Sequence, residues 1–175
     1  RLDHVTEDDF YRMINKSEPS LIRTEADELT YCLHIMVRYE LEKRMFDGSL
    51  TAHDLPAEWN RLYKEYLGID VPDDRQGVLQ DSHWANGNIG YFPSYAIGSA
   101  YGAQYLQEMS KDLDVDAVVR SGDLTPINNW LEDRIWKHGC MKDPVALFES
   151  VCGKFDPDCY VAYLEKKFTE VYGLS

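Results

Sequence analysis

The feature that most constrains the fold is the spacing of apolar residues between Thr24 and Phe46. They recur at steps of three or four residues until Gly48, and they are Leu29, Leu33, Met36, Val37, Leu41 and Met45. This spacing places one apolar stripe along a long helix that ends at a glycine. No segment of the chain shows the sustained two-residue alternation of a half-buried strand. We therefore predict an all-α fold.

Capping acids and prolines predict further helices on both sides of the long one. Thr6, followed by three acids, opens a short helix that closes near Lys16, and Pro56 opens one that ends at Gly68. The later helices are expected over residues 93–113, 116–120, 126–138, 144–151 and 157–171. No flexible linker divides the sequence, so residues 1–175 are predicted to form a single helical segment.

Residues 69–92 differ in composition from the predicted helices. Prolines, glycines and polar side chains predominate there, which predicts a loop with a short strand or turn at Val78-Leu79. Loops of this length inside a compact domain are usually functional. We expect this segment to carry part of a site.

Composition excludes two classes of partner. The 175 residues hold 18 Lys and Arg against 31 Asp and Glu, a net charge of −13, which opposes nonspecific binding to nucleic acid or anionic membrane. No apolar run reaches the roughly 18–20 residues that span a bilayer, and the first ten residues are too acidic for a signal peptide. We expect a cytoplasmic protein with no nucleic-acid or membrane partner.

Cysteines and histidines do not form a metal-binding pattern. The four cysteines lack a C-x-x-C pair and are interpreted as reduced thiols, with a disulfide among Cys140, Cys152 and Cys159 as the alternative. No histidine is followed by Glu, and no H-x-x-x-H spacing occurs. His34, amid apolar neighbours, is interpreted as a core or interface histidine.

Two segments carry residue types that ordinary helix packing does not need. Arg23 lies beside acids at the start of the long helix, where it either forms a local ion pair or binds a substrate carboxylate through two parallel hydrogen bonds. Residues 77–84 and 90–95 gather an amide, a carboxylate, an imidazole and two phenols. These groups either stabilise a developing oxyanion or form a buried polar network in which Trp84, Tyr91 and Phe92 are core.

These segments resemble motifs of one peptidase family. Residues 22–27, I-R-T-E-A-D, are similar to its I-R-x-x-A-D motif, and residues 77–84, G-V-L-Q-D-S-H-W, are similar to its G-x-x-Q-D-x-H-W motif. The family is the carboxypeptidase Taq family of zinc metallocarboxypeptidases. The resemblance extends through residues 28–31, 33–36, 54–56 and 91–95 and covers most of the chain.

The resemblance implies a helical, cleft-containing, zincin-like peptidase, a cytosolic homodimer that releases residues one at a time from free peptide C-termini. The family binds zinc through H-E-x-x-H and a Glu of a following H-E-S/G-Q motif, and neither motif occurs in this sequence. The chain thus resembles the C-terminal third of the enzyme. We expect that an N-terminal catalytic part precedes it, that no zinc binds this chain, and that it is inactive alone.

The resemblance also implies roles for individual residues. Arg23 would hold the terminal carboxylate of the substrate, and His83 with Tyr91 or Tyr95 would stabilise the oxyanion that forms when zinc-bound water attacks the peptide carbonyl. The supporting residues would be Gln80 and Asp81, which orient His83, and Asp27 of the first motif. The alternative is a stand-alone, catalytically inactive helical module for protein interaction.

Overall fold

The structure of the protein, a computed structural model, describes residues 3–174. Regular structure within that range consists of α-helices and short 3-10 helices, with no strand. The predicted all-α fold is confirmed. The described residues form two compact units: unit 1 holds the chain up to Ala96 together with the residues from Phe168 onward, and unit 2 holds Ile97–Lys167. The prediction of one helical segment stays a prediction, and each unit is described by itself.

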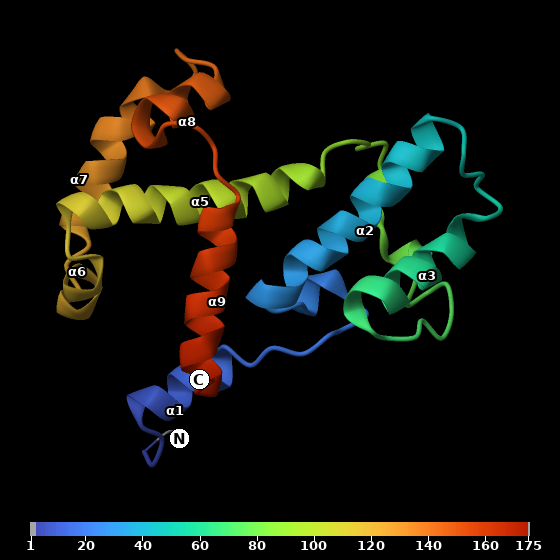
Figure 1. Cartoon of the computed structure of the whole chain (residues 1–175), viewed down its shortest axis with the longest axis horizontal. Coiled ribbons are helices and arrows are strands. Elements are labelled where there is room, and N and C mark those ends of the chain that lie inside the picture. The colour runs from blue at the N-terminus through green and yellow to red at the C-terminus, as the bar shows by residue number, and fades with distance from the viewer. Residues whose placement is uncertain (1–2, 175) are drawn as a thin grey trace. The chain divides into compact units, whose positions relative to one another are not determined.

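Unit 1 is built around two packed helices, α2 and α3, which lie side by side (Figure 1). Their shared core buries Val37 and Leu41 of α2 against Trp59 and Tyr63 of α3, all with no exposed surface. The elements of unit 1 are α1 (Glu7–Ile14), η1 (Arg23–Glu25), α2 (Glu28–Phe46), α3 (Leu55–Leu67), η2 (Val78–Gln80), α4 (Ser82–Ala85), the first residues of α5 (Pro93–Asp112) and the last of α9 (Asp158–Tyr172).

Unit 2 contains the remainder of α5 and α9 with α6 (Val115–Ser121), α7 (Thr125–Arg134), η3 (Trp136–His138) and α8 (Pro144–Cys152). Its centre is Phe148, which stacks on Tyr101 with 3.8 Å between ring centroids. The buried Gln104 holds the turn after α8, because its amide nitrogen donates to the carbonyl of Lys154 at 2.9 Å and its oxygen accepts from the amide of Asp156 at 2.9 Å.

A second face of α2 buries polar side chains in place of apolar ones. Thr30, His34, Arg38 and Glu42 are all buried, and they follow one another at four-residue steps. Residues four apart lie one above the other on a helix, so these four form a single polar row. We call it the polar row of α2. Its last two members, Arg38 and Glu42, bind residues of the segment 69–92.

Helix boundaries differ from the sequence prediction where a side chain ends or begins a helix. The predicted helix from Thr24 is interrupted, because Asp27 adopts an extended conformation and its carboxylate caps α2 at Leu29 and Thr30. The helix expected to reach His138 ends at Arg134 and is followed by a 3-10 turn. The alternative of a strand at Val78-Leu79 is wrong, since this pair lies in the 3-10 turn η2.

Within residues 3–174, no helix combines the length and the apolar character needed to cross a membrane. Cys140, Cys152 and Cys159 are free thiols in the structure. Burial raises the pKa of the Cys152 thiol to about 11.

The α2–α3 core predicts a large penalty for Leu41→Ala. The Leu41 side chain has no exposed surface, so its truncation leaves a cavity and should lower the free energy of unfolding by about 2–5 kcal/mol. Met36→Ala on the same helix is the control, because Met36 is 46% exposed and should change the stability by less than about 0.5 kcal/mol. Urea unfolding followed by circular dichroism measures both values. Equal losses would contradict the assigned core.

Candidate functional site

The two sequence motifs meet at Arg23. This residue lies in η1, half-buried, and its Nη2 donates to Ser82 Oγ at 3.3 Å. Its guanidinium carbon lies 4.8 Å from the centroid of the Phe92 ring, and its Nε is buried without a hydrogen-bond partner. Arg23 thus brings the first motif, residues 22–27, into contact with Ser82 of the second motif, residues 77–84.

Asp27 fixes the segment that carries Arg23. Its carboxylate accepts hydrogen bonds from Ser17 Oγ at 2.8 Å, from the amide of Glu18 at 2.9 Å and from the amide and hydroxyl of Thr30 at 3.0 Å. Burial acts to raise the pKa of Asp27, but these hydrogen bonds outweigh it and hold the pKa below its ordinary value. Asp27 therefore joins the chain before η1 to the start of α2.

His83 is surrounded by aromatic rings. Its ring centroid lies 4.8 Å from Phe92, 5.9 Å from Tyr91 and 6.2 Å from Tyr95. Its Nδ1 is buried without a partner. The predicted cluster of one imidazole and two phenols is therefore assembled, although the residues come from α4, from the turn before α5 and from α5 itself.

The two tyrosines are open to solvent. Tyr91 is 54% exposed and Tyr95 is 42% exposed, and their rings meet edge to face with 5.6 Å between centroids. A hydrogen bond with the Tyr91 phenol raises the pKa of Tyr95. The interpretation of Tyr91 as a core residue is wrong, whereas Phe92, at 1% exposure, is core. Both phenol rings lie beside His83, and the choice between Tyr91 and Tyr95 stays open.

Asp81 acts on His83 through the backbone. One carboxylate oxygen accepts from Arg38 Nε at 2.8 Å, and the other accepts from the amide of Trp84 at 2.8 Å, which caps α4. The carboxylate thus contacts the backbone of α4, and the orientation of His83 by Asp81 stays a prediction. Asp81 therefore sets the position of the short helix that carries His83.

Gln80 stabilises the loop before α4. Its side-chain amide donates a hydrogen bond to the carbonyl of Arg75. Gly77 lies within the same turn, where an added Cβ would stand 2.8 Å from Val71 Cγ1 and 3.1 Å from the carbonyl oxygen of Asp73. The close approach requires glycine at this position. Gln80 thus supports the loop and is not placed against the His83 ring.

Sequence reasoning missed Arg38 and Glu42 of the polar row. Glu42 Oε1 accepts from Trp84 Nε1 at 2.7 Å and from the amide of Gly90 at 3.3 Å. Arg38 pairs with Asp81, and neither side chain of that pair is exposed. The available signal was the four-residue spacing of Thr30, His34, Arg38 and Glu42, which places four polar residues on one face of the helix. The apolar stripe of the same helix already indicated that it packs against other elements.

His34 is a core histidine, as predicted. It has no exposed surface, and its Nδ1 lies 3.0 Å from the hydroxyl of Tyr63. That hydroxyl donates in turn to the carbonyl of Leu21 at 3.5 Å, two residues before Arg23. Burial, aided by the charge of Arg38, lowers the pKa of His34 to about 4. The imidazole is therefore neutral near pH 7.

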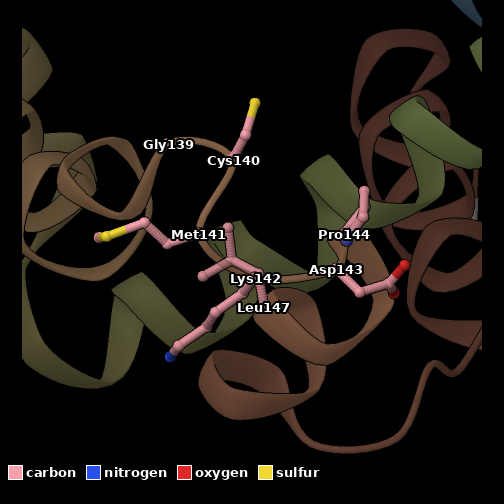
Figure 2. A pocket seen from close by; sticks show the side chains of 7 residues that line it. All are labelled: Gly139, Cys140, Met141, Lys142, Asp143, Pro144 and Leu147. Atoms are coloured by element: carbon pink, nitrogen blue, oxygen red, sulfur yellow. The ribbon is translucent and has the colours of Figure 1, made fainter.

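No group of three or more His, Cys, Asp or Glu side chains in residues 3–174 is placed to hold a metal ion. The described residues therefore do not fit a zinc site. A hollow of about 430 Å³ lies in unit 2 and is lined by residues 139–144 and Leu147. Figure 2 shows that the side chains of Cys140, Met141 and Lys142 point in different directions, so they form no convergent set of donors. None of the predicted site residues lines this hollow.

The fold matches part of the solved structures of metallocarboxypeptidases. The crystal structure of M32 carboxypeptidase from Deinococcus radiodurans R1 matches 99% of this chain and 35% of its own, with a TM-score of 0.95 and 38% sequence identity. Trypanosoma cruzi metallocarboxypeptidase 1 matches 95% of this chain and 34% of its own, with a TM-score of 0.92 and 37% identity.

Sequence comparison agrees with the structural likeness. Carboxypeptidase 1 of Bacillus subtilis (strain 168) is 45% identical over 170 residues, which are 96% of this chain and 34% of the relative. Thermostable carboxypeptidase 1 of Thermus thermophilus is 43% identical over 175 residues, 98% of this chain and 34% of the relative. The model of the carboxypeptidase Taq (M32) metallopeptidases matches residues 1–168, and the chain belongs to that family. It spans about a third of the length of these relatives.

The low pKa of His34 predicts how stability depends on pH. Because the pKa falls from 6.5 to about 4 on folding, the unfolded chain binds more protons between these values. The contribution of neutral His34 is complete above pH 6.5 and is lost as the pH falls toward 4, by about 3 kcal/mol in total. Urea unfolding at pH 7 and pH 4.5 should show this loss.

His34→Gln should flatten the pH dependence, since Gln does not titrate. His53→Gln is the matched control, because the His53 side chain is 95% exposed and the slope should remain that of the unmodified chain. Identical slopes for all three proteins would rule out His34 as the responsible group.

Proposed function

We propose that this chain is part of a zinc metallocarboxypeptidase that releases C-terminal amino acids from peptides. In this proposal the chain supplies the groups that bind the substrate carboxylate and stabilise the oxyanion, and the zinc ligands lie outside the chain. The observation that carries the proposal is the contact of Arg23 with Ser82, which unites the two motifs beside His83, Tyr91 and Tyr95.

The role of Arg23 follows from its chemistry and surroundings. A guanidinium presents donors in a planar fork that matches a carboxylate, and it keeps its charge at all physiological pH values. The bond to Ser82 Oγ is long at 3.3 Å, and Ser82 is exposed, so an incoming carboxylate can replace it with a shorter, charge-assisted bond. The ring of Phe92 supports the guanidinium from one side. Arg23 thereby selects peptides with a free C-terminus.

His83, Tyr91 and Tyr95 provide donors beside this anchor. An imidazole N–H and a phenol O–H that are already in place stabilise negative charge on the carbonyl oxygen as it develops, without reorganisation at the moment of reaction. The packing of His83 against Phe92 fixes the imidazole plane. No step assigned to this chain runs through a metal, because the described residues do not fit one. The active form would be the cytosolic homodimer that the resemblance implies.

A stand-alone interaction module is the second candidate. It is favoured by α1, which buries none of its residues and exposes Met13 at 61% and Ile14 at 64%. The two candidates are distinguished by the gene: an upstream reading frame with H-E-x-x-H supports the enzyme, and a start codon immediately before Arg1 supports the module.

Arg23→Ala should weaken substrate binding in an assembled enzyme. The host is Bacillus subtilis carboxypeptidase 1 with its matching third replaced by this chain. Loss of a charge-assisted hydrogen bond, worth about 1.5–3 kcal/mol, should raise KM about 10- to 100-fold for a peptide with a free C-terminus. Arg23→Lys should recover part of this loss, because the charge remains without the fork.

Arg120→Ala, at an exposed position of α6, is the control for the loss of a positive charge and should leave KM unchanged. Steady-state release of the C-terminal amino acid measures these values. A KM for Arg23→Ala equal to that of the parent hybrid would refute the carboxylate-binding role.

The 175-residue chain alone should be inactive. With zinc supplied and an unblocked peptide as substrate, we expect no release of C-terminal amino acids above a buffer blank, because the described residues hold no metal cluster. Circular dichroism confirms that the assayed chain is helical. Activity that is retained by the chain and lost in His83→Ala would contradict this expectation.

A further inference from the structure

Arg38 joins the core of unit 1 to the candidate site. Its side chain has no exposed surface, and its guanidinium carbon lies 4.5 Å from the Trp59 ring centroid and 5.1 Å from that of Phe92. Nε donates to Asp81 at 2.8 Å, and Nη1 donates to the carbonyl of His34 at 2.8 Å. The buried Arg38 cation therefore contacts Trp59 of the core, the capping residue Asp81 and the Phe92 ring. Arg23 lies over that same Phe92 ring.

Glu42 holds the other end of the same segment. It is 5% exposed, one helical turn after Arg38, and its Oε1 binds both the Trp84 indole and the amide of Gly90. Together, Arg38 and Glu42 hold residues 81–90 against α2 at two points. We call this pair of residues the α2 clamp.

The helix that carries His83 depends on such external support. Helix α4 has four residues, and a helix this short is not stable through its own hydrogen bonds. Its beginning is held by Asp81, which Arg38 binds, and its Trp84 is held by Glu42. The position of the His83 ring therefore follows the α2 clamp and not the propensity of its own segment.

Stability alone does not account for the clamp. A buried ion pair is replaced by well-packed apolar residues at little cost or with a gain in stability in many proteins. Arg38 moreover leaves its Nη2 buried without a partner, which is unfavourable. The Arg38–Asp81 ion pair restricts the position of α4, because a hydrogen bond from Nε–H to a carboxylate is directional and an apolar contact is not.

We propose that Arg38 and Glu42 are positioning residues, which act through Asp81, Trp84 and Gly90 to hold His83 against Tyr91 and Tyr95. The proposal rests on the proposed function for its catalytic meaning. Its structural content, the placement of the His83 ring, is measurable without activity. The experiment below separates the two.

The first readout is the His83 ring itself in the 175-residue chain. With ¹³C-labelled histidine, the His83 signal is assigned through His83→Gln, and its ring-current shift reports the packing against Phe92, 4.8 Å away. Glu42→Ala should move this signal toward its value in an unfolded chain, and Glu42→Gln, which keeps the accepting oxygen, should restore most of the shift. Glu40→Gln on the same helix, where Glu40 pairs with Lys43 at the surface, is the matched control and should leave the signal in place.

The second readout is the split between kcat and KM in the hybrid enzyme described above. A displaced His83 should lower kcat about 10- to 100-fold in Glu42→Ala, since misplacement by about 1 Å costs that much, with KM changed less than about threefold because Arg23 is retained. The double variant Arg38→Met with Asp81→Leu replaces the ion pair by apolar side chains. Because Asp81→Leu also removes the cap of α4 at Trp84, this variant should unfold at a lower urea concentration than the parent but remain folded without urea, and it should still show the low kcat.

The outcomes are distinguishable. An unmoved His83 signal in Glu42→Ala, or a folded double variant with full kcat, would overturn the proposal. A His83 signal that is displaced in the 175-residue chain by Glu42→Ala would support the positioning role. If the unsubstituted hybrid then had no carboxypeptidase activity, that result would count against the proposed function alone. Should Glu42→Ala not fold, the double variant gives the same test.

Discussion

The site depends on one buried ion pair, between Arg38 of α2 and Asp81 at the start of α4. Neither side chain reaches solvent, so both charges are compensated within the protein by each other and by backbone groups. The desolvation cost of such a pair is high and is offset only when the geometry is fixed. Because Asp81 also caps α4, a shift of the pair displaces the helix that bears His83. The interaction therefore specifies geometry more than it adds stability.

Helix α2 buries two faces, one apolar and one polar. Val37 and Leu41 pack on α3 and form the apolar core, whereas Arg38 and Glu42 of the polar row bind the loop of residues 69–92. The ring of Trp59 belongs to both sides, since it lies in the core and under the Arg38 guanidinium. The site of unit 1 is thus built directly on its core, without an intervening layer. The core contacts the site through Arg38, which lies over Trp59 and binds Asp81, and through Trp84, whose ring meets Trp59 edge to face with 6.0 Å between centroids.

The sequence predicted the helices well because their ends carry local signals. The prolines at 56, 93, 126 and 144 and the glycines at 68 and 153 lie at or beside observed helix ends. The predicted start of the long helix at Thr24 was wrong, because an acid such as Asp27 near a helix start is compatible with either a first-turn residue or the cap. The meeting of Arg23 with the second motif was suggested by resemblance only. Arg38 and Glu42 were missed since their partners lie 42 to 48 residues away, and period analysis assigns charged residues to the solvent.

The contact between His34 and Tyr63 has a direction. A carbonyl oxygen only accepts, so the Tyr63 hydroxyl is the donor in its 3.5 Å contact with Leu21, and its oxygen is then available to accept from His34 Nδ1, 3.0 Å away. In the tautomer with the proton on Nδ1, the other ring nitrogen, Nε2, carries a lone pair and is buried without a partner. An unpaired acceptor is easier to bury than an unpaired N–H. The segment that leads to Arg23 is therefore joined to the core by two consecutive hydrogen bonds, His34–Tyr63 and Tyr63–Leu21, which end at a peptide carbonyl.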